Sequence, residues 1–283
     1  MSSTLVSTAE LAAHANDPDW RVFDCRHDLS DPGYGEKAYA REHIPGALFL
    51  HLDRDLSGAK TGSNGRHPLP DVESFAARLS ACGVGPETQV VAYDNEGGAF
   101  ASRLWWMLRW LGHEKVALLD GGLAGWRRAK LPLTGEIPQV APARFVARPQ
   151  PGLVDLEFVR THLGRPDMLL LDARSEERYA GQQETLDPVG GHIPGALNRF
   201  YFDNLDDPGI YFKSSEELHQ EFSELLAGRM PGELVHQCGS GVTACHNLLA
   251  MEIAGLPGSR LYAGSWSEWC VAPACPVAVG DTP

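Results

Sequence analysis

His-Ile-Pro-Gly-Ala-Leu at residues 43–48 recurs, letter for letter, at residues 192–197. Six identical residues in the same order are hard to obtain by chance, and self-similarity at long spacing indicates a repeated structural unit. Other landmarks keep the same order and nearly the same offset: Phe23–Arg26 against Leu171–Arg174, Leu119–Gly122 against Tyr262–Ser265, and Trp126 against Trp269. The sequence therefore predicts that the chain is a tandem duplication.

The length of 283 residues agrees with two domains, since one domain takes roughly 150 residues. Residues 136–152 contain four prolines and little periodicity, which is typical of an extended linker. We therefore expect a first domain at residues 1–135, a linker at 136–152 and a second domain at 153–283.

The composition is that of a globular protein, with 43% hydrophobic and 22% charged residues. No apolar run is long enough to cross a bilayer, and the first residues lack the basic region of a signal peptide. The six cysteines form no dense framework, which is typical of reduced thiols, so we expect a cytoplasmic protein. A net charge of −13 argues against nucleic acid or a membrane as a partner, because both attract basic surfaces.

Short apolar runs alternate with helical patterns in each copy. Residues 90–93 and 234–237 are predicted to be buried strands, and residues 99–111 and 243–254 have helical spacing. This order predicts an α/β fold in each copy, a mostly parallel sheet flanked by helices. Binding sites in such sheets lie beyond the carboxyl ends of the strands.

One cysteine occupies such a position. Cys238 follows the predicted strand at 234–237 and is followed by Gly239, Ser240 and Gly241 before the next helix. Two glycines allow the backbone to curl so that successive N–H groups point inward, and the helix adds its positive end. Such a cradle stabilises a thiolate and the terminal sulfur of a persulfide.

Three other interpretations compete with a reactive Cys238. A free cysteine is often only a small buried apolar residue. A zinc site could use His236, Cys238, Cys245 and His246, but the last two are neighbours on a predicted helix and point about 100° apart. A cysteine phosphatase would need an arginine at the far end of the loop to bind phosphate, and Ala244 stands there.

The duplicated Asp-x-Arg and His-Ile-Pro-Gly-Ala motifs, with Cys-Gly-Ser-Gly-Val-Thr-Ala at residues 238–244, resemble the two-domain rhodanese family over essentially the whole chain. The cysteine loop is most similar to that of 3-mercaptopyruvate sulfurtransferases. The resemblance implies tandem rhodanese-like domains, of which the first is catalytically inactive. In the repeat alignment Asp94 lies opposite Cys238, and a carboxylate cannot form a persulfide.

The resemblance also implies a reaction. The Cys238 thiolate would attack the sulfur of 3-mercaptopyruvate, a small-molecule donor, and release pyruvate. The resulting persulfide would pass to cyanide or to a thiol acceptor such as thioredoxin. We expect neither a cofactor nor a metal.

Further site residues follow from the same resemblance. Ser240, His67 and Asp53 match the residues proposed to deliver protons to the leaving pyruvate, and Arg178 matches an arginine that binds the substrate carboxylate. A solvated loop histidine remains the alternative for His67, and a surface ion pair the alternative for Arg178. The loop residues expected to contact substrate are Gly239, Gly241, Val242 and Thr243.

The sequence bears on the choice of sulfur donor in two ways. Related mercaptopyruvate enzymes often carry a second arginine soon after the first, whereas this chain has none between Arg178 and Arg199. The loop after Cys238 contains no Lys or Arg, and a thiosulfate dianion would favour basic neighbours, which favours mercaptopyruvate. Thiosulfate remains the alternative donor, and a persulfide carrier without enzymatic turnover is the non-enzymatic alternative.

Overall fold

A computed structural model describes residues 4–283, which divide into two compact units. Unit 1 comprises the chain up to Gly58, Leu69–Pro151 and Leu205–Phe212. Unit 2 comprises Ala59–Pro68, Gly152–Asn204 and Lys213–Pro283. Each half of the chain therefore contributes one short segment to the unit formed mainly by the other half.

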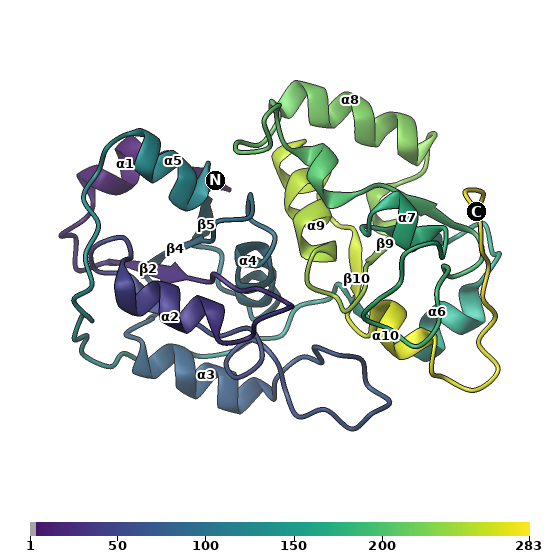
Figure 1. The fold of residues 1–283 in the computed structure, drawn as a ribbon, viewed down its shortest axis with the longest axis horizontal. Helices are drawn as coiled ribbons and strands as arrows, with labels where there is room; N and C mark the ends of the chain where they lie inside the picture. Colours follow the sequence, from purple (N-terminus) through teal and green to yellow (C-terminus); the bar gives the residue numbers. More distant parts are fainter. Residues whose placement is uncertain (1–3) are drawn as a thin grey trace. The chain divides into compact units, whose positions relative to one another are not determined.

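Unit 1 is built on a parallel sheet with the strand order β1-β5-β4-β2-β3 (Figure 1). Its strands are β1 (Leu5–Val6), β2 (Trp20–Asp24), β3 (Leu48–Phe49), β4 (Gln89–Tyr93) and β5 (Val116–Leu119). Its helices are α1 (Thr8–Ala13), α2 (Tyr34–Arg41), α3 (Val72–Ala81), α4 (Ala101–Trp110) and α5 (Gly122–Arg128).

Both faces of the central strands are buried, which explains why their sequences are continuous apolar runs. Alternate residues of β4, Val91 and Tyr93, point into a core that also contains Leu11 of α1 and Trp126 of α5. Helices α1 and α5 therefore cover the same face of this sheet (Figure 1).

Unit 2 repeats this architecture with the parallel order β6-β10-β9-β7-β8. Its strands are β6 (Leu153–Val154), β7 (Leu169–Asp172), β8 (Ala196–Asn198), β9 (Leu234–Gln237) and β10 (Arg260–Tyr262). Its helices are α6 (Leu156–His162), α7 (Glu176–Tyr179), α8 (Ser215–Leu226), α9 (Ala244–Ile253) and α10 (Ser265–Trp269), with 3-10 turns η1 (Tyr201–Asn204) and η2 (Pro231–Glu233). The predicted pair of α/β folds, each with a parallel sheet flanked by helices, is confirmed.

The predicted elements next to the cysteine loop and its counterpart are present with small shifts at their ends. The two strands are β4 and β9, and the two helices are α4 and α9, which begin one or two residues later than expected. The helices start later because the preceding residues still belong to the turn that leaves the strand. Gly112 and Gly255, with φ of +81° and +71°, end the two helices.

The repeated motifs have equivalent structural roles in the two units. Arg26 and Asp24 form a buried ion pair of 2.7 Å in unit 1, and Arg174 and Asp172 form one of 2.6 Å in unit 2. The histidines of the hexapeptides, His43 and His192, stack on Tyr39 and Tyr179 with ring centroids 4.0 and 3.8 Å apart. The two copies of each motif therefore make the same contacts in the two units.

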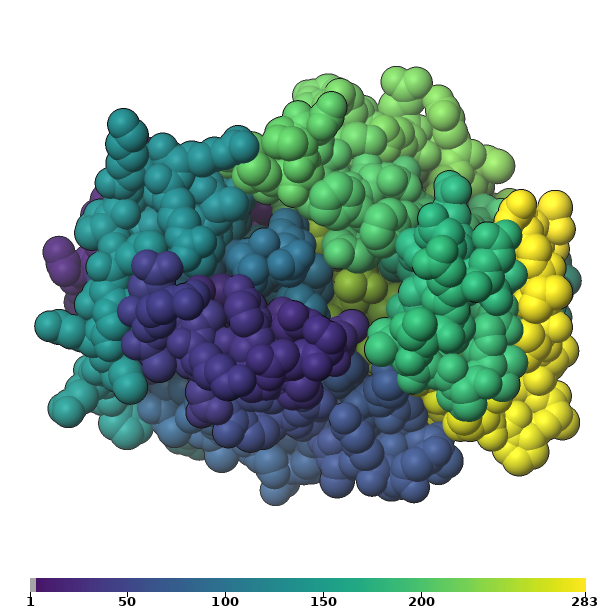
Figure 2. Space-filling model, viewed as in Figure 1, coloured from purple at the N-terminus to yellow at the C-terminus, as the bar shows by residue number. Residues whose placement is uncertain are grey.

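Segments without regular structure complete the units. Residues 136–151 contain no helix or strand and pack on unit 1, where Ala143 N–H donates to Ser80 O at 2.9 Å and Phe145 is buried. The last residues, yellow in Figure 2, pack on unit 2, where Gly280 N–H donates to Ala180 O at 3.0 Å. Between residues 4 and 283, no helix has the length and apolar character needed to span a membrane.

Candidate active site

Cys238 lies where β9 ends, at the start of the loop that leads into α9. The cysteine is a free thiol with 2% of its surface exposed. Its backbone is fixed on both sides, because its N–H donates to Ser265 Oγ at 3.1 Å and its carbonyl accepts from Trp266 N–H at 3.0 Å. Gly239 O accepts from Ser267 N–H at 2.9 Å. The start of α10 therefore holds the first two residues of the loop.

Gly241 produces the curl of this loop. Its φ is +73°, and a Cβ atom at this position would lie 2.3 Å from Ala263 O, so only glycine fits. On either side of it, the N–H groups of Ser240, Val242 and Thr243 have no acceptor within the described part of the chain, residues 4–283. Donors of this kind, gathered around one side chain, can stabilise a negative charge.

The corresponding loop of unit 1 begins along a similar backbone path. Gly97 has φ of +64°, close to that of Gly241. Asp94 O accepts from Leu123 N–H at 2.9 Å, as Cys238 O accepts from its partner in α10. The two loops are therefore similar at their start, with Asp94 at the position of Cys238, and they differ at the fourth residue after it, where Gly98 has φ of +97° and Val242 has no positive φ.

In unit 1 this loop binds the carboxylate of its own first residue. The Asp94 carboxylate accepts from the N–H groups of Glu96 at 2.8 Å, Gly98 at 2.9 Å, and Phe100 and Ala101 at 2.8 Å each. Burial raises the pKa of Asp94, and the four N–H donors oppose this effect by favouring the charged form. The loop thus accommodates an anion carried by the side chain at its first position.

His67 and Ser240 are hydrogen-bonded, with 2.7 Å between His67 Nδ1 and Ser240 Oγ. Both side chains are buried. His67 comes from the first half of the chain, but it belongs to Ala59–Pro68, the segment that is part of unit 2.

Two backbone contacts fix the segment that carries His67. Arg66 N–H donates to Ser267 Oγ at 2.9 Å. Gly65, at φ of +80°, packs so closely on Gly264 that a Cβ atom would lie 2.8 Å from Gly264 O. The segment therefore rests on the same turn, at the start of α10, that holds the cysteine loop.

Two guanidinium groups lie over the residue after Cys238. A Cβ atom on Gly239 would lie 2.8 Å from Arg66 Nη2 and 3.3 Å from both terminal nitrogens of Arg178. Arg178 was predicted, but Arg66 was missed. Its position directly before His67 in the sequence was the available signal.

The loop itself contains no basic residue, but Arg66 and Arg178 reach it from other segments of the chain. Contrary to the expectation from the sequence, the folded protein does offer basic neighbours to a dianionic donor. Other loop residues expected at the site, Val242 and Thr243, lie on the same turn between Gly241 and α9.

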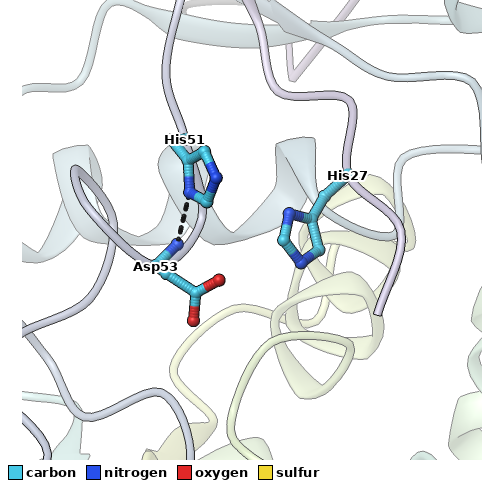
Figure 3. Close-up of side chains that lie close together, drawn as sticks. All are labelled: His27, His51 and Asp53. Atoms are coloured by element: carbon cyan, nitrogen blue, oxygen red, sulfur yellow. Dashed lines mark hydrogen bonds between the residues drawn. The ribbon is translucent and has the colours of Figure 1, made fainter. Parts of the chain in front are cut away.

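Asp53 belongs to unit 1, where its carboxylate lies near His27 and His51 (Figure 3). The potential metal-binding atoms of these three residues lie within 4.8 Å of one another, the only such group among residues 4–283. However, His51 Nδ1 accepts from Asp53 N–H at 3.0 Å, and His51 Nε2 lies 3.0 Å from Pro32 O. Both ring nitrogens are thus engaged by the backbone, so this cluster does not provide a ready metal site.

The residues considered for zinc near Cys238 are engaged in other contacts. Cys245 Sγ lies 3.4 Å from Gly241 O, and His246 Nδ1 lies 3.2 Å from Asn204 Nδ2. His236 is completely buried, and burial lowers its pKa to about 3. The chemistry available at this site is that of a cysteine, a Ser–His pair and two arginines.

Comparison with known proteins agrees with this architecture. Residues 7–129 and 155–272 each match the family of rhodanese-like domains. A probable 3-mercaptopyruvate sulfurtransferase of Pseudomonas aeruginosa is 50% identical over 283 residues, which cover 99% of each chain. A putative thiosulfate sulfurtransferase of Mycobacterium tuberculosis is 36% identical over 98% of this chain and 97% of its own.

The solved structures give the same result. The 3-mercaptopyruvate sulfurtransferase from Leishmania major is 31% identical with a TM-score of 0.85, over 96% of this chain and 76% of that one. Since both halves match the family and a full-length relative shares half of the residues, the chain belongs to the rhodanese family and contains two rhodanese-like domains in tandem.

Proposed function

We propose that this protein is a 3-mercaptopyruvate sulfurtransferase whose Cys238 carries the transferred sulfur as a persulfide. The Cys238 thiolate attacks the sulfur of the substrate, and an S–S bond forms as the C–S bond breaks. The electron pair of that bond leaves with the three-carbon fragment as the enolate of pyruvate, which is then protonated. Transfer of the outer sulfur to an acceptor thiol regenerates the thiolate.

The observation that carries this proposal is that the loop of unit 1 binds the carboxylate of Asp94 with its backbone N–H groups. Its four N–H donors bind a carboxylate attached at the loop's first residue. The corresponding loop in unit 2 begins with Cys238, and its N–H groups at Ser240, Val242 and Thr243 have no acceptor among residues 4–283. A thiolate or persulfide anion on Cys238 would occupy the place of the Asp94 carboxylate. The same comparison supports a catalytically silent first domain.

Proton delivery to the leaving enolate is assigned to Ser240 and His67. Their 2.7 Å hydrogen bond allows the imidazole to replace a proton that the hydroxyl donates, and Ser240 is two residues from the nucleophile. Asp53 is included among the proton-delivery residues on the strength of the sequence resemblance. When thiosulfate is the donor, sulfite leaves and no carbon atom has to be protonated. A pair that delivers a proton therefore favours mercaptopyruvate as the donor.

The substrate carboxylate is assigned to Arg178 and Arg66. Guanidinium groups bind carboxylates in a bidentate manner, and both groups lie over Gly239. Arg66 thereby supplies the second arginine that the sequence lacks between Arg178 and Arg199. Glu184 and Asp187 pair with the same arginines and balance their charge, which suits a monoanion better than a dianion.

Thiosulfate remains the alternative donor, because the mycobacterial relative is named for it. The acceptor is proposed to be a thiol, such as that of thioredoxin, and the site of action the cytoplasm.

The test compares both donors with purified protein and with the Cys238→Ser variant. Pyruvate, sulfide and thiocyanate are measured with a thiol or cyanide as acceptor, and mass spectrometry under non-reducing conditions follows the persulfide. We expect faster turnover with mercaptopyruvate and one added sulfur on Cys238. Faster turnover with thiosulfate would reverse the donor assignment. A persulfide without small-donor turnover would identify a carrier.

A further inference from the structure

Two buried carboxylates lie behind the arginines of the proposed substrate site. Asp187 and Glu184 have only 3% of their side-chain surface exposed, against 24% for Arg66 and 22% for Arg178. Solvent and ligands therefore reach the guanidinium groups but not the carboxylates.

Asp187 contacts both arginines. Its Oδ1 accepts from Arg66 Nη1 in a short ion pair, and its Oδ2 lies 3.5 Å from Arg178 Nη2. Glu184 accepts from Arg178 Nε at 3.2 Å and from Arg178 Nη2 at 2.8 Å. Asp187 is therefore the acid that links the arginine of segment Ala59–Pro68 to the arginine of α7.

The ion pairs use one edge of each guanidinium group. Arg66 binds Asp187 through Nη1, while its Nη2 is the atom closest to Gly239. Arg178 binds Glu184 through Nε and Nη2, and its Nη1 has no carboxylate partner within residues 4–283. Both Nη1 and Nη2 lie beside Gly239, each 3.3 Å from an added Cβ atom. Each arginine therefore keeps a terminal nitrogen beside the residue next to the nucleophile that does not take part in these ion pairs.

The carboxylates are themselves held in place. Glu184 Oε1 accepts from the N–H groups of Leu186 at 2.8 Å and Asp187 at 3.0 Å, which closes the turn between the two acids. Burial raises the pKa of Glu184, but these N–H groups and Arg178 outweigh it, and the net pKa is lowered. The turn thus presents two fixed negative charges to the arginines.

We infer that Asp187 is a positioning residue that holds Arg66 and Arg178 as one clamp, oriented toward the carboxylate of the substrate. This inference rests on the proposed function and deepens it, because it explains how two arginines from distant segments act on one anion. Flexible guanidinium groups without this anchor would each have to be ordered when the substrate binds, at a cost in affinity.

The experiment compares Asp187→Asn with Asp187→Glu and with a matched control, Asp167→Asn. Asp167 pairs with Arg165 on the surface of unit 2, so its substitution removes the same charge away from the site. KM and kcat for mercaptopyruvate are measured, together with calorimetric binding of pyruvate to each variant in a Cys238→Ser background. Thermal unfolding verifies that each variant is folded.

We expect Asp187→Asn to raise KM and the dissociation constant of pyruvate by roughly tenfold or more, because small misplacements of binding groups have large effects. We expect kcat at saturation to fall much less, and Asp187→Glu to recover part of the affinity. Unchanged or tighter pyruvate binding by folded Asp187→Asn would overturn the inference. If instead the wild-type protein neither turns over mercaptopyruvate nor binds pyruvate, the proposed function fails.

Discussion

His67 Nδ1 lies 2.7 Å from Ser240 Oγ, although 173 positions separate the two residues in the sequence. Segment Ala59–Pro68 makes this contact possible, because it leaves the first half of the chain and packs within unit 2. The nucleophile loop and its hydroxyl–imidazole pair therefore depend on a segment that a truncated second half would not contain.

Replacing either member of this pair should slow pyruvate formation. Ser240→Ala removes the hydroxyl that donates the proton, and His67→Ala removes the base that replaces it, so we expect about 10²-fold slower formation. Transfer of sulfur from the persulfide to an acceptor should change much less. Stopped-flow or quenched measurement of each half-reaction separates the two effects.

The control for this pair is Ser223→Ala on α8, which removes a hydroxyl outside the site. Equal slowing of both half-reactions in Ser240→Ala would assign the serine to persulfide stabilisation. Unchanged rates in both variants would remove the pair from the mechanism.

Gly241→Ala should damage both the loop and the fold. A residue with a side chain at φ of +73° costs about 1–2 kcal/mol, and its Cβ would also lie 2.3 Å from Ala263 O. Gly255→Ala is the matched control, because Gly255 has φ of +71° with no atom within 4 Å of an added Cβ. Urea unfolding should show the larger loss for Gly241→Ala, and only that variant should lose activity. Equal losses of stability in Gly241→Ala and Gly255→Ala would show that the loop rearranges to accommodate the added methyl group.

The sequence was sufficient for the repeated architecture because its signals are local. The hexapeptides at 43–48 and 192–197, the apolar runs of β4 and β9, and the helical spacing that follows each run all act over a few residues. These local signals predicted two parallel sheets with a loop at the carboxyl end of a central strand.

The electrostatics of the site could not be derived in the same way. No periodicity indicates that Arg66 packs against Asp187, 121 positions away, or that both arginines reach Gly239. The cysteine loop has no basic residue in its own sequence, but in the folded protein two arginines lie beside it. Long-range packing decided the charge around Cys238.

Asp94→Asn should destabilise unit 1 without affecting catalysis. The amide replaces one accepting oxygen by an NH₂ group that faces backbone N–H donors, and the variant loses charge-assisted hydrogen bonds, which costs about 2–4 kcal/mol. Activity per folded molecule should stay within about twofold of wild type, since the proposed chemistry uses Cys238. The control is Asp207→Asn, which makes the same change at an exposed position of unit 1. Loss of persulfide formation in folded Asp94→Asn would contradict the silent role of this loop.

Acid should destabilise the protein partly through His236. Its pKa is lowered to about 3 by burial, whereas the unfolded chain has the ordinary value of about 6.5. Between these two pKa values the unfolded state binds a proton that the folded state does not, so falling pH favours unfolding by up to about 1.4 kcal/mol per pH unit. His236→Phe removes this contribution and two buried ring nitrogens that find no hydrogen-bond partner among residues 4–283.

We therefore expect His236→Phe to match or exceed the stability of the wild type at pH 7, because a buried unpaired polar atom costs about 1–3 kcal/mol. Its advantage should grow as the pH is lowered from 6 to 4 in urea titrations followed by circular dichroism. The control is His162→Phe on α6, where the ring is only partly buried and already stacks on Phe158. A constant difference between His236→Phe and wild type across this range would mean that the buried ring is protonated in the folded state, and would place a compensating charge beside β9.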